Sequence, residues 1–169
     1  FKLIKNLPIT HIATKIKENY ADYDGFVVVY GTDTMAWLAG SLSYMLEGLG
    51  KPVVCTGSMD PVSDRNLERT YDSIREIKEN DKKGSDGPRN LIDSIELVAQ
   101  SGNELPKIPE VLLCFYGKIF RGNTTEKKSS YQRDAFSLDG ENQKIFGEIR
   151  HGETEEEIER DGLPVEFKA

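Results

Sequence analysis

The sequence predicts an α/β protein whose sheet is doubly wound and mostly parallel. Three apolar runs, at residues 26–30, 52–56 and 111–116, are rich in the β-branched and large apolar residues that fill buried strands. Segments with helical periodicity lie between these runs, and this alternation favours helices on both faces of a parallel sheet. With 169 residues, the chain is long enough for one domain with a substantial core.

The spacing of apolar residues predicts three helices around these strands. The first covers residues 11–20, with apolar positions on one stripe. The second covers about 34–49 and is apolar on almost every side, so we expect it to be well buried. The third follows Pro88, and we expect its core-facing side to consist of positions 91, 92, 95, 98 and 99.

Composition excludes several classes of protein. The 22 lysines and arginines are outnumbered by 29 aspartates and glutamates, a net charge of −7, which argues against a nucleic-acid-binding surface. No apolar run approaches the length of a membrane span. The two cysteines, Cys55 and Cys114, lie in strand-like runs and are predicted to be buried free thiols.

The stretch with the most chemical information is Gly31-Thr32-Asp33-Thr34-Met35, directly after the first strand. A strand, a tight turn and a helix place Thr32 and Asp33 at the carboxyl end of a buried strand, where open α/β sheets bind ligands. Asp33 or Thr34 acting only as a helix cap is the simpler interpretation of these five residues taken alone.

The wider sequence resembles the L-asparaginase family, nearest its cytoplasmic, type I-like branch. The resemblance covers roughly residues 9 to 136 and rests on Gly31–Met35, on Gly50-Lys51-Pro52-Val53-Val54-Cys55-Thr56-Gly57-Ser58 and on Gly117 through Lys127. It implies hydrolysis of L-asparagine to aspartate and ammonia, with L-glutamine as an alternative substrate. It also implies a homo-oligomer in the cytoplasm that uses neither a metal nor an organic cofactor.

The resemblance assigns roles to individual residues. Thr32, Asp33 and Lys127 match the family's proton-handling set, and Asp33 would also hold the substrate's α-ammonium group. Lys128 would replace Lys127 if the register slipped by one, and without the resemblance both lysines would be assigned to a solvated surface. A lysine that acts as a base must be partly buried, because withdrawal from water favours its neutral form. Ser58 is a candidate substrate contact, although its turn could equally bind nothing.

Part of the family's machinery is missing from this sequence. The attacking threonine of the family lies in a Thr-Gly-Gly-Thr loop, which does not occur here, and Thr10 and Thr14 lie in or beside a polar helix. We therefore keep a non-catalytic, asparaginase-like binding or assembly module as the alternative. A nucleotide-binding domain lacks support because no glycine-rich phosphate loop follows a strand. A tRNA-dependent amidotransferase subunit shares the Gly-Thr-Asp-Thr signature, but the acidic charge disfavours it.

The predicted organisation is a partial asparaginase-like α/β domain at 1–136 and a divergent acidic tail at 137–169. An additional helix is predicted at about 62–84, between the second strand and the Ser-Asp-Gly segment that starts at Ser85. The chain opens without a secretory or transit segment, which is consistent with a cytoplasmic location, although Phe1 is not an initiator methionine.

Overall fold

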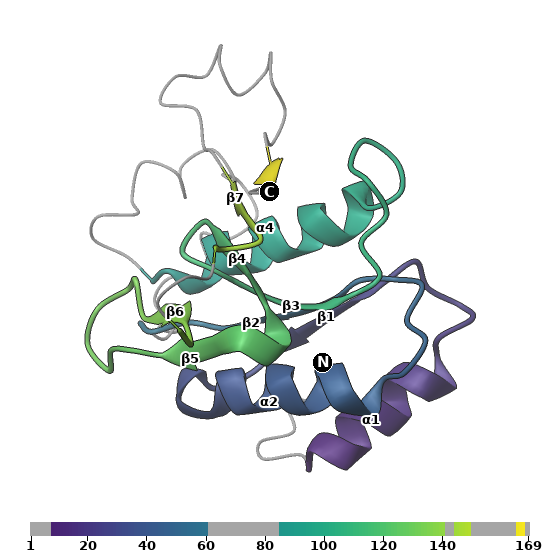
Figure 1. Cartoon of the computed structure of the whole chain (residues 1–169), viewed down its shortest axis with the longest axis horizontal. Coiled ribbons are helices and arrows are strands. Elements are labelled where there is room, and N and C mark those ends of the chain that lie inside the picture. Colours follow the sequence, from purple (N-terminus) through teal and green to yellow (C-terminus); the bar gives the residue numbers. More distant parts are fainter. Residues whose placement is uncertain (1–7, 61–84, 141–143, 150–164, 168–169) are drawn as a thin grey trace, which may run out of the picture.

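A computed structural model describes residues 8–60, 85–140, 144–149 and 165–167, which form a sheet between two layers of helices (Figure 1). The α-helices within these residues are α1 (Ile9–Glu18), α2 (Thr32–Met45) and α4 (Gly87–Gln100). The strands are β1 (Phe26–Val29), β2 (Val53–Thr56), β3 (Val111–Phe115), β4 (Lys118–Arg121), β5 (Thr125–Lys127), β6 (Phe136–Leu138), β7 (Gly147–Ile149) and β8 (Val165–Phe167).

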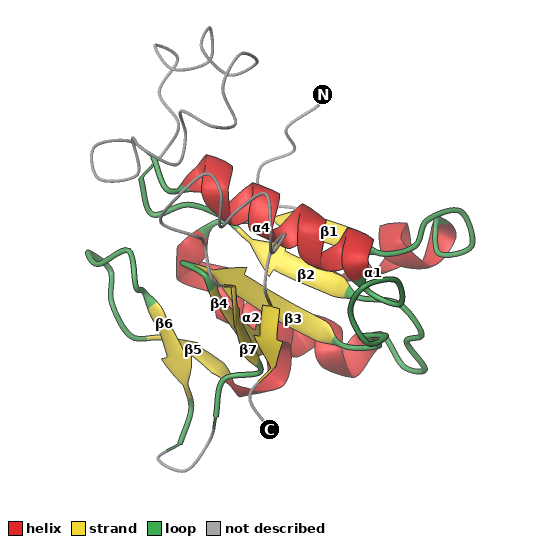
Figure 2. Ribbon diagram, turned by 90° about the horizontal axis from the view of Figure 1, so that it is seen from above, coloured by secondary structure: helices red, strands yellow, loops and turns green. Residues whose placement is uncertain are grey.

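Six strands form the main sheet in the order β1-β2-β3-β4-β7-β8, and β5 and β6 form a separate two-stranded sheet (Figure 2). The pairs β1–β2 and β2–β3 are parallel, whereas the pairs from β3 to β8 are antiparallel. The direction changes at Tyr116 and Gly117, whose φ angles of 53° and 70° suit the tight turn of a hairpin. The carboxyl ends of the three parallel strands therefore share one edge.

The helices cover both faces of this sheet, with α1 and α2 on one face and α4 on the other (Figure 1). The alternating side chains of β3 divide between two cores, as the period of a strand requires. Val111, Leu113 and Phe115 pack in the core beneath α2, whereas Leu112 and Cys114 pack in the core beneath α4. The predicted α/β class is confirmed, and both cysteines are buried free thiols as expected.

The three predicted strands and the three helices predicted around them are present, but the burial expected of α2 is only partly correct. Met35, Leu38, Ala39 and Leu42 are fully buried, as the apolar sequence predicts. Trp37 and Tyr44, however, lie two turns apart on the outer face and are 76% and 74% exposed. A helix that is apolar on every side need not be buried on every side. One side of α2 faces outward and exposes Trp37 and Tyr44.

The face of α4 that was expected to enter the core does so only in part, since Val98 packs against the core. Leu91 and Ile95 are exposed, whereas Asn90, Asp93 and Ser94 are buried along with Leu97. Asn90 turns inward because the turns at the ends of β2 and β3 present backbone groups to this helix, and its side-chain amide binds them. Satisfying buried backbone groups outweighs the burial of apolar side chains here.

Other predictions fall partly or wholly outside the described residues. The additional helix at 62–84 and the acidic stretch near Glu153 belong to the part of the chain that is not described. The division at residue 136 stays a prediction, although β7 and β8 from the segment after it join the main sheet. No helix within the described residues is long and apolar enough to cross a membrane.

Candidate active site

Thr32 and Asp33 form the first turn of α2, immediately after β1. The helix begins at Thr32 with Gly31 as its N-cap residue, at φ −70° and ψ 134°. No side chain of the described residues caps this end, so the interpretation of Asp33 or Thr34 as a simple cap is not supported. The carboxylate of Asp33 is 88% exposed and lies at the positive end of the helix dipole, where an anion is favoured.

Lys127 reaches this turn from the end of β5. Its Nζ lies 2.9 Å from Thr32 Oγ1 and 2.7 Å from Asp33 Oδ1. The lysine side chain is only 12% exposed, so its amine is largely withdrawn from water. An amine and a hydroxyl at this distance can exchange a proton, whereas the exposed carboxylate is accessible to a ligand. The structure therefore brings three of the expected residues together.

The neighbouring Lys128 has a different set of contacts. Its Nζ lies 3.2 Å from Asp134 Oδ2, and Lys118 binds the same oxygen at 2.9 Å. Burial alone would raise the pKa of Asp134, but hydrogen bonds from the two lysines hold that pKa below its ordinary value. Of the two adjacent lysines, Lys127 is the one beside Thr32.

Ser58 lies in the turn that follows β2, from Gly57 to Asp60, and its hydroxyl is already engaged. It donates a hydrogen bond of 2.7 Å to Asp86 Oδ1 and also contacts the carbonyl oxygen of Asp60. The turn starts beside the Thr32 loop, because Tyr30 N donates to the carbonyl oxygen of Thr56 at 2.8 Å. Among the described residues, the Ser58 hydroxyl contacts Asp60, Ser85 and Asp86 but neither Thr32 nor Lys127, so Ser58 is near the site only through its backbone neighbours.

Gly57 allows the two turns to approach each other. A methyl group at this position would lie 2.6 Å from Met35 Cε and even closer to the carbonyl oxygen of Tyr30. Only a residue without a side chain fits in this space. The turn after β2 and the turn after β1 therefore pack backbone against backbone, next to Thr32.

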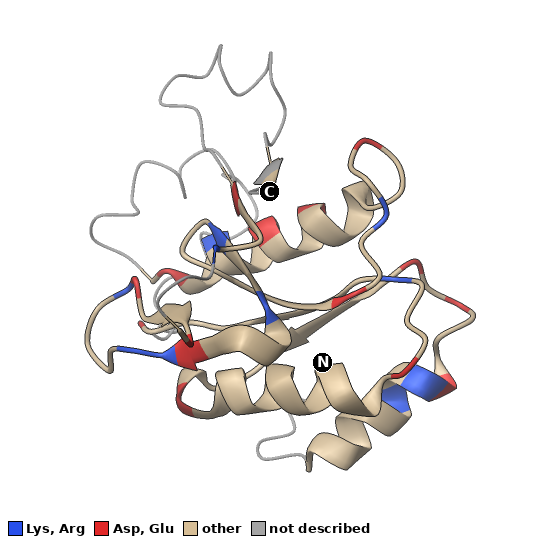
Figure 3. Cartoon of the chain, in the orientation of Figure 1, with Lys and Arg blue, Asp and Glu red and all other residues tan. Residues whose placement is uncertain are grey.

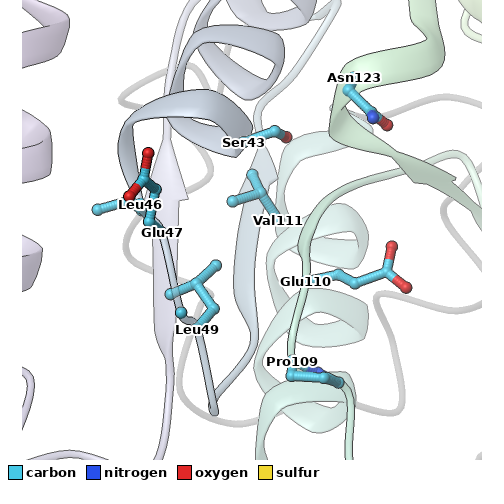
Figure 4. A pocket seen from close by; sticks show the side chains of 9 residues that line it. Ser43, Leu46, Glu47, Leu49, Pro109, Glu110, Val111 and Asn123 are labelled. Carbon is cyan, nitrogen blue, oxygen red and sulfur yellow. The ribbon is translucent and has the colours of Figure 1, made fainter.

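A hollow of about 440 Å³ lies at the other end of α2 and is separate from these residues. Figure 4 shows its lining side chains, which come from the end of α2, the loop that follows it, the residues around the start of β3 and the short 3-10 turn after β4: Ser43, Leu46, Glu47, Leu49, Pro109, Glu110, Val111 and Asn123. Helix α2 has 14 residues and a rise of about 1.5 Å per residue, so roughly 20 Å separate its two ends. The hollow does not belong to the candidate site.

Charge is distributed unevenly around the site. Helix α2 carries a charge only at Asp33, while the loop between β5 and β6 contributes Arg133 and Asp134 (Figure 3). Arg133 binds Asp60 Oδ2 through both Nε and Nη2 at 2.9 Å, which joins the turn after β2 to the hairpin that carries Lys127. No group of His, Cys, Asp or Glu residues suited to holding a metal ion occurs in the described segments.

Sequence reasoning missed the residues that hold these turns in place. Asp86 and Asn90 belong to the Ser-Asp-Gly segment and received no role, and Arg133 and Asp134 were not singled out for one. Asp86 and Asn90 could have been identified because they are polar residues spaced four apart at the start of a helix. Side chains with this spacing lie on the same helix face and can bind neighbouring backbone groups. Thr10 and Thr14 lie on α1, where the Thr14 hydroxyl donates to the carbonyl oxygen of Thr10.

Comparisons with known proteins identify the family to which the chain is similar. The family described as "Asparaginase, N-terminal" matches residues 3–72 and 77–160. L-asparaginase 1 of Escherichia coli is 41% identical over 127 residues, which cover 75% of this chain and 31% of that protein. A 60 kDa lysophospholipase of Mus musculus is 40% identical over 125 residues, covering 74% of this chain and 18% of that protein.

A solved structure extends the likeness to the fold. The thermostable L-asparaginase from Thermococcus kodakarensis has a TM-score of 0.70 and 26% identity, and the alignment covers 99% of this chain and 40% of that one. The chain thus spans less than half the length of each of these proteins. The family match, the identities and the shared fold all agree, and the chain belongs to the asparaginase family, to whose N-terminal region it corresponds.

Proposed function

We propose that this chain is part of an L-asparaginase that hydrolyses L-asparagine to L-aspartate and ammonia. The observation that carries the proposal is the position of Lys127, whose largely buried amine lies within hydrogen-bond distance of both Thr32 and Asp33. A hydroxyl, an amine and an exposed carboxylate supply groups for proton transfer and for binding an amino acid's ammonium group, two of the tasks in amide hydrolysis of an amino acid. The family membership points to the same reaction.

The proposed reaction assigns one task to each residue. A nucleophilic hydroxyl attacks the side-chain amide carbon, the C–N bond breaks, and the nitrogen leaves as ammonia after gaining a proton; water then hydrolyses the ester. Thr32 and Lys127 transfer protons, and Asp33 binds the α-ammonium group through a charge-assisted hydrogen bond that a plain amide lacks. The attacking hydroxyl belongs to a Thr-Gly-Gly-Thr loop, which these 169 residues do not include.

The test measures ammonia release from L-asparagine by the chain alone and by the chain preceded by a segment that carries a Thr-Gly-Gly-Thr loop. We expect turnover only in the second case. Lys127→Ala should reduce turnover by a factor of about 10² to 10⁴, the usual contribution of a positioned acid or base. Lys128→Ala is the matched control, because Lys128 binds Asp134 instead of Thr32, and it should retain most of the activity.

Other outcomes would point to different functions. Binding of L-asparagine without turnover in either form would favour the non-catalytic binding or assembly module. Ammonia release that depends on an aminoacylated tRNA would favour an amidotransferase subunit. Equal loss of activity in Lys127→Ala and Lys128→Ala would contradict the role given to Lys127. The same assay with L-glutamine determines substrate preference, and the predicted homo-oligomer and cytoplasmic location require sedimentation and localisation measurements.

A further inference from the structure

Asp86 is the buried centre of a hydrogen-bond network between α4 and the turn after β2. Its side chain is one of the few carboxylates withdrawn from solvent, with the residue only 3% exposed. Oδ1 accepts hydrogen bonds from Ser58 Oγ at 2.7 Å and from Asp60 N at 2.9 Å. Oδ2 accepts one from Met59 N at 3.1 Å. Three consecutive residues of the turn are therefore bound by one carboxylate.

Asn90 extends the network from the next turn of the same helix. Its Nδ2 donates to Asp86 Oδ2 at 3.1 Å and to the carbonyl oxygen of Gly57 at 3.0 Å. Its Oδ1 accepts a hydrogen bond of 3.0 Å from Tyr116 N, in the turn after β3. The start of α4 thus fixes the turns at the carboxyl ends of two neighbouring strands.

The turn is also held from its other side. Arg133 binds the Asp60 carboxylate from the loop between β5 and β6, the hairpin that carries Lys127. Asp86 consequently holds the backbone of the turn, and Arg133 of the β5–β6 hairpin holds the Asp60 side chain. Gly57, at the start of the turn, packs directly against the backbone of Tyr30.

We propose that Asp86 is a positioning residue, which holds the Gly57–Asp60 turn in the conformation that contacts the amino-acid substrate. The inference rests on the proposed function, since it assigns the turn a substrate contact. Asp86 itself does not touch the reacting atoms. It acts through the backbone amides of Met59 and Asp60 and through the hydroxyl of Ser58, all of which need an acceptor away from water.

The Asp86→Asn variant tests the proposal because it keeps the size of the side chain. Each carboxylate oxygen of Asp86 accepts two donors, so an amide in either orientation presents an NH₂ group to two of them. In the chain preceded by a Thr-Gly-Gly-Thr segment, we expect KM for L-asparagine to rise at least tenfold while kcat changes by less than about threefold, because the Thr32–Lys127 pair is not disturbed. Asp93→Asn is the control: it removes a carboxylate that is buried on the same helix and lies beside Cys114, and it should leave KM unchanged.

A second variant and a second measurement guard against misfolding and against failure of the proposed function. Arg133→Ala leaves α4 intact and should raise KM in the same direction. Hydrogen exchange at the Met59 and Asp60 amides needs no activity, and it should become at least tenfold faster in Asp86→Asn than in the parent. An unchanged KM in Asp86→Asn, an equal rise in Asp93→Asn, or unchanged exchange at these amides would overturn the proposal. Absence of turnover in the parent that carries the Thr-Gly-Gly-Thr segment, with faster exchange in Asp86→Asn, would refute the proposed function alone.

Discussion

Replacing Gly57 by alanine tests whether the two turns beside Thr32 depend on direct backbone packing. The added methyl group would lie 2.6 Å from Met35 Cε, about 1 Å inside the ordinary carbon–carbon contact of roughly 3.5–4.0 Å. It would lie closer still to the Tyr30 carbonyl oxygen, which is a backbone atom of a residue whose N–H donates to the carbonyl oxygen of Thr56 in the neighbouring strand. Backbone must therefore move.

We expect Gly57→Ala to lower the free energy of unfolding by about 2–3 kcal/mol, the upper part of the range for overpacked cores. For a chain of this size this corresponds to a fall in Tm of about 4–12 °C. A shift of about 1 Å in the Thr32 loop should also reduce turnover by roughly 10²-fold, wherever turnover is measured.

Urea denaturation followed by circular dichroism measures the stability change, and Gly31→Ala provides the control. Position 31 has no heavy atom within 4 Å of an added methyl group, and its φ of −70° suits alanine. That variant should be within about 1 kcal/mol of the parent, or slightly more stable. Equal stability of the two alanine variants would refute the packing argument.

Three further predictions concern charge and ionisation. Asp33→Asn should weaken binding of L-asparagine roughly tenfold or more by removing the charged acceptor, and unchanged affinity in calorimetric titration would contradict the α-ammonium role. The same variant should lower the free energy of unfolding, measured by urea denaturation, by under about 1 kcal/mol because the carboxylate is exposed. Burial raises the pKa of Cys55 to about 12 and also raises that of Cys114. Neither thiol should therefore react with a thiol reagent at pH 8 until the chain unfolds. Because the unfolded chain loses these protons first, the free energy of unfolding should fall as pH rises from about 8.5 towards 12. Asp134→Asn should lower the free energy of unfolding by less than about 1 kcal/mol at pH 7. This difference between variant and parent should disappear as pH falls from about 3.9 through the lowered pKa of Asp134 in the folded state. A constant difference down to pH 2 would exclude the lysine contacts as its cause.

The α/β class and the βα unit around Thr32 were predictable because local patterns determine them. A run of valines followed by Gly-Thr-Asp and an apolar helix leaves few other structures for residues 26–45. The contact between Thr32 and Lys127 is different in kind. Nothing in a polar loop with two adjacent lysines distinguishes one from the other, so only the resemblance to the family selected Lys127. The structure shows that the adjacent Lys128 forms an ion pair with Asp134 instead.

The inward face of α4 shows where periodicity misleads. The pattern of apolar residues placed Leu91 and Ile95 in the core, yet Asn90 occupies the inner side. Counting apolar positions measures the gain from burying side chains, but it does not include the cost of leaving turn amides and carbonyls without partners. Those groups come from β2 and β3, which are distant in sequence, so no local window contains the information.

The pairing of Lys127 with Thr32 has a consequence for the order in which the chain folds. The two residues are 95 positions apart, and closing a loop of that length costs roughly 4 kcal/mol of chain entropy before any contact compensates for it. Helices form in microseconds or less, whereas long-range strand pairing controls the slow steps. During refolding the chain should therefore regain its helical signal well before it regains affinity for an amino acid, and recovery of affinity marks completion of the last strands.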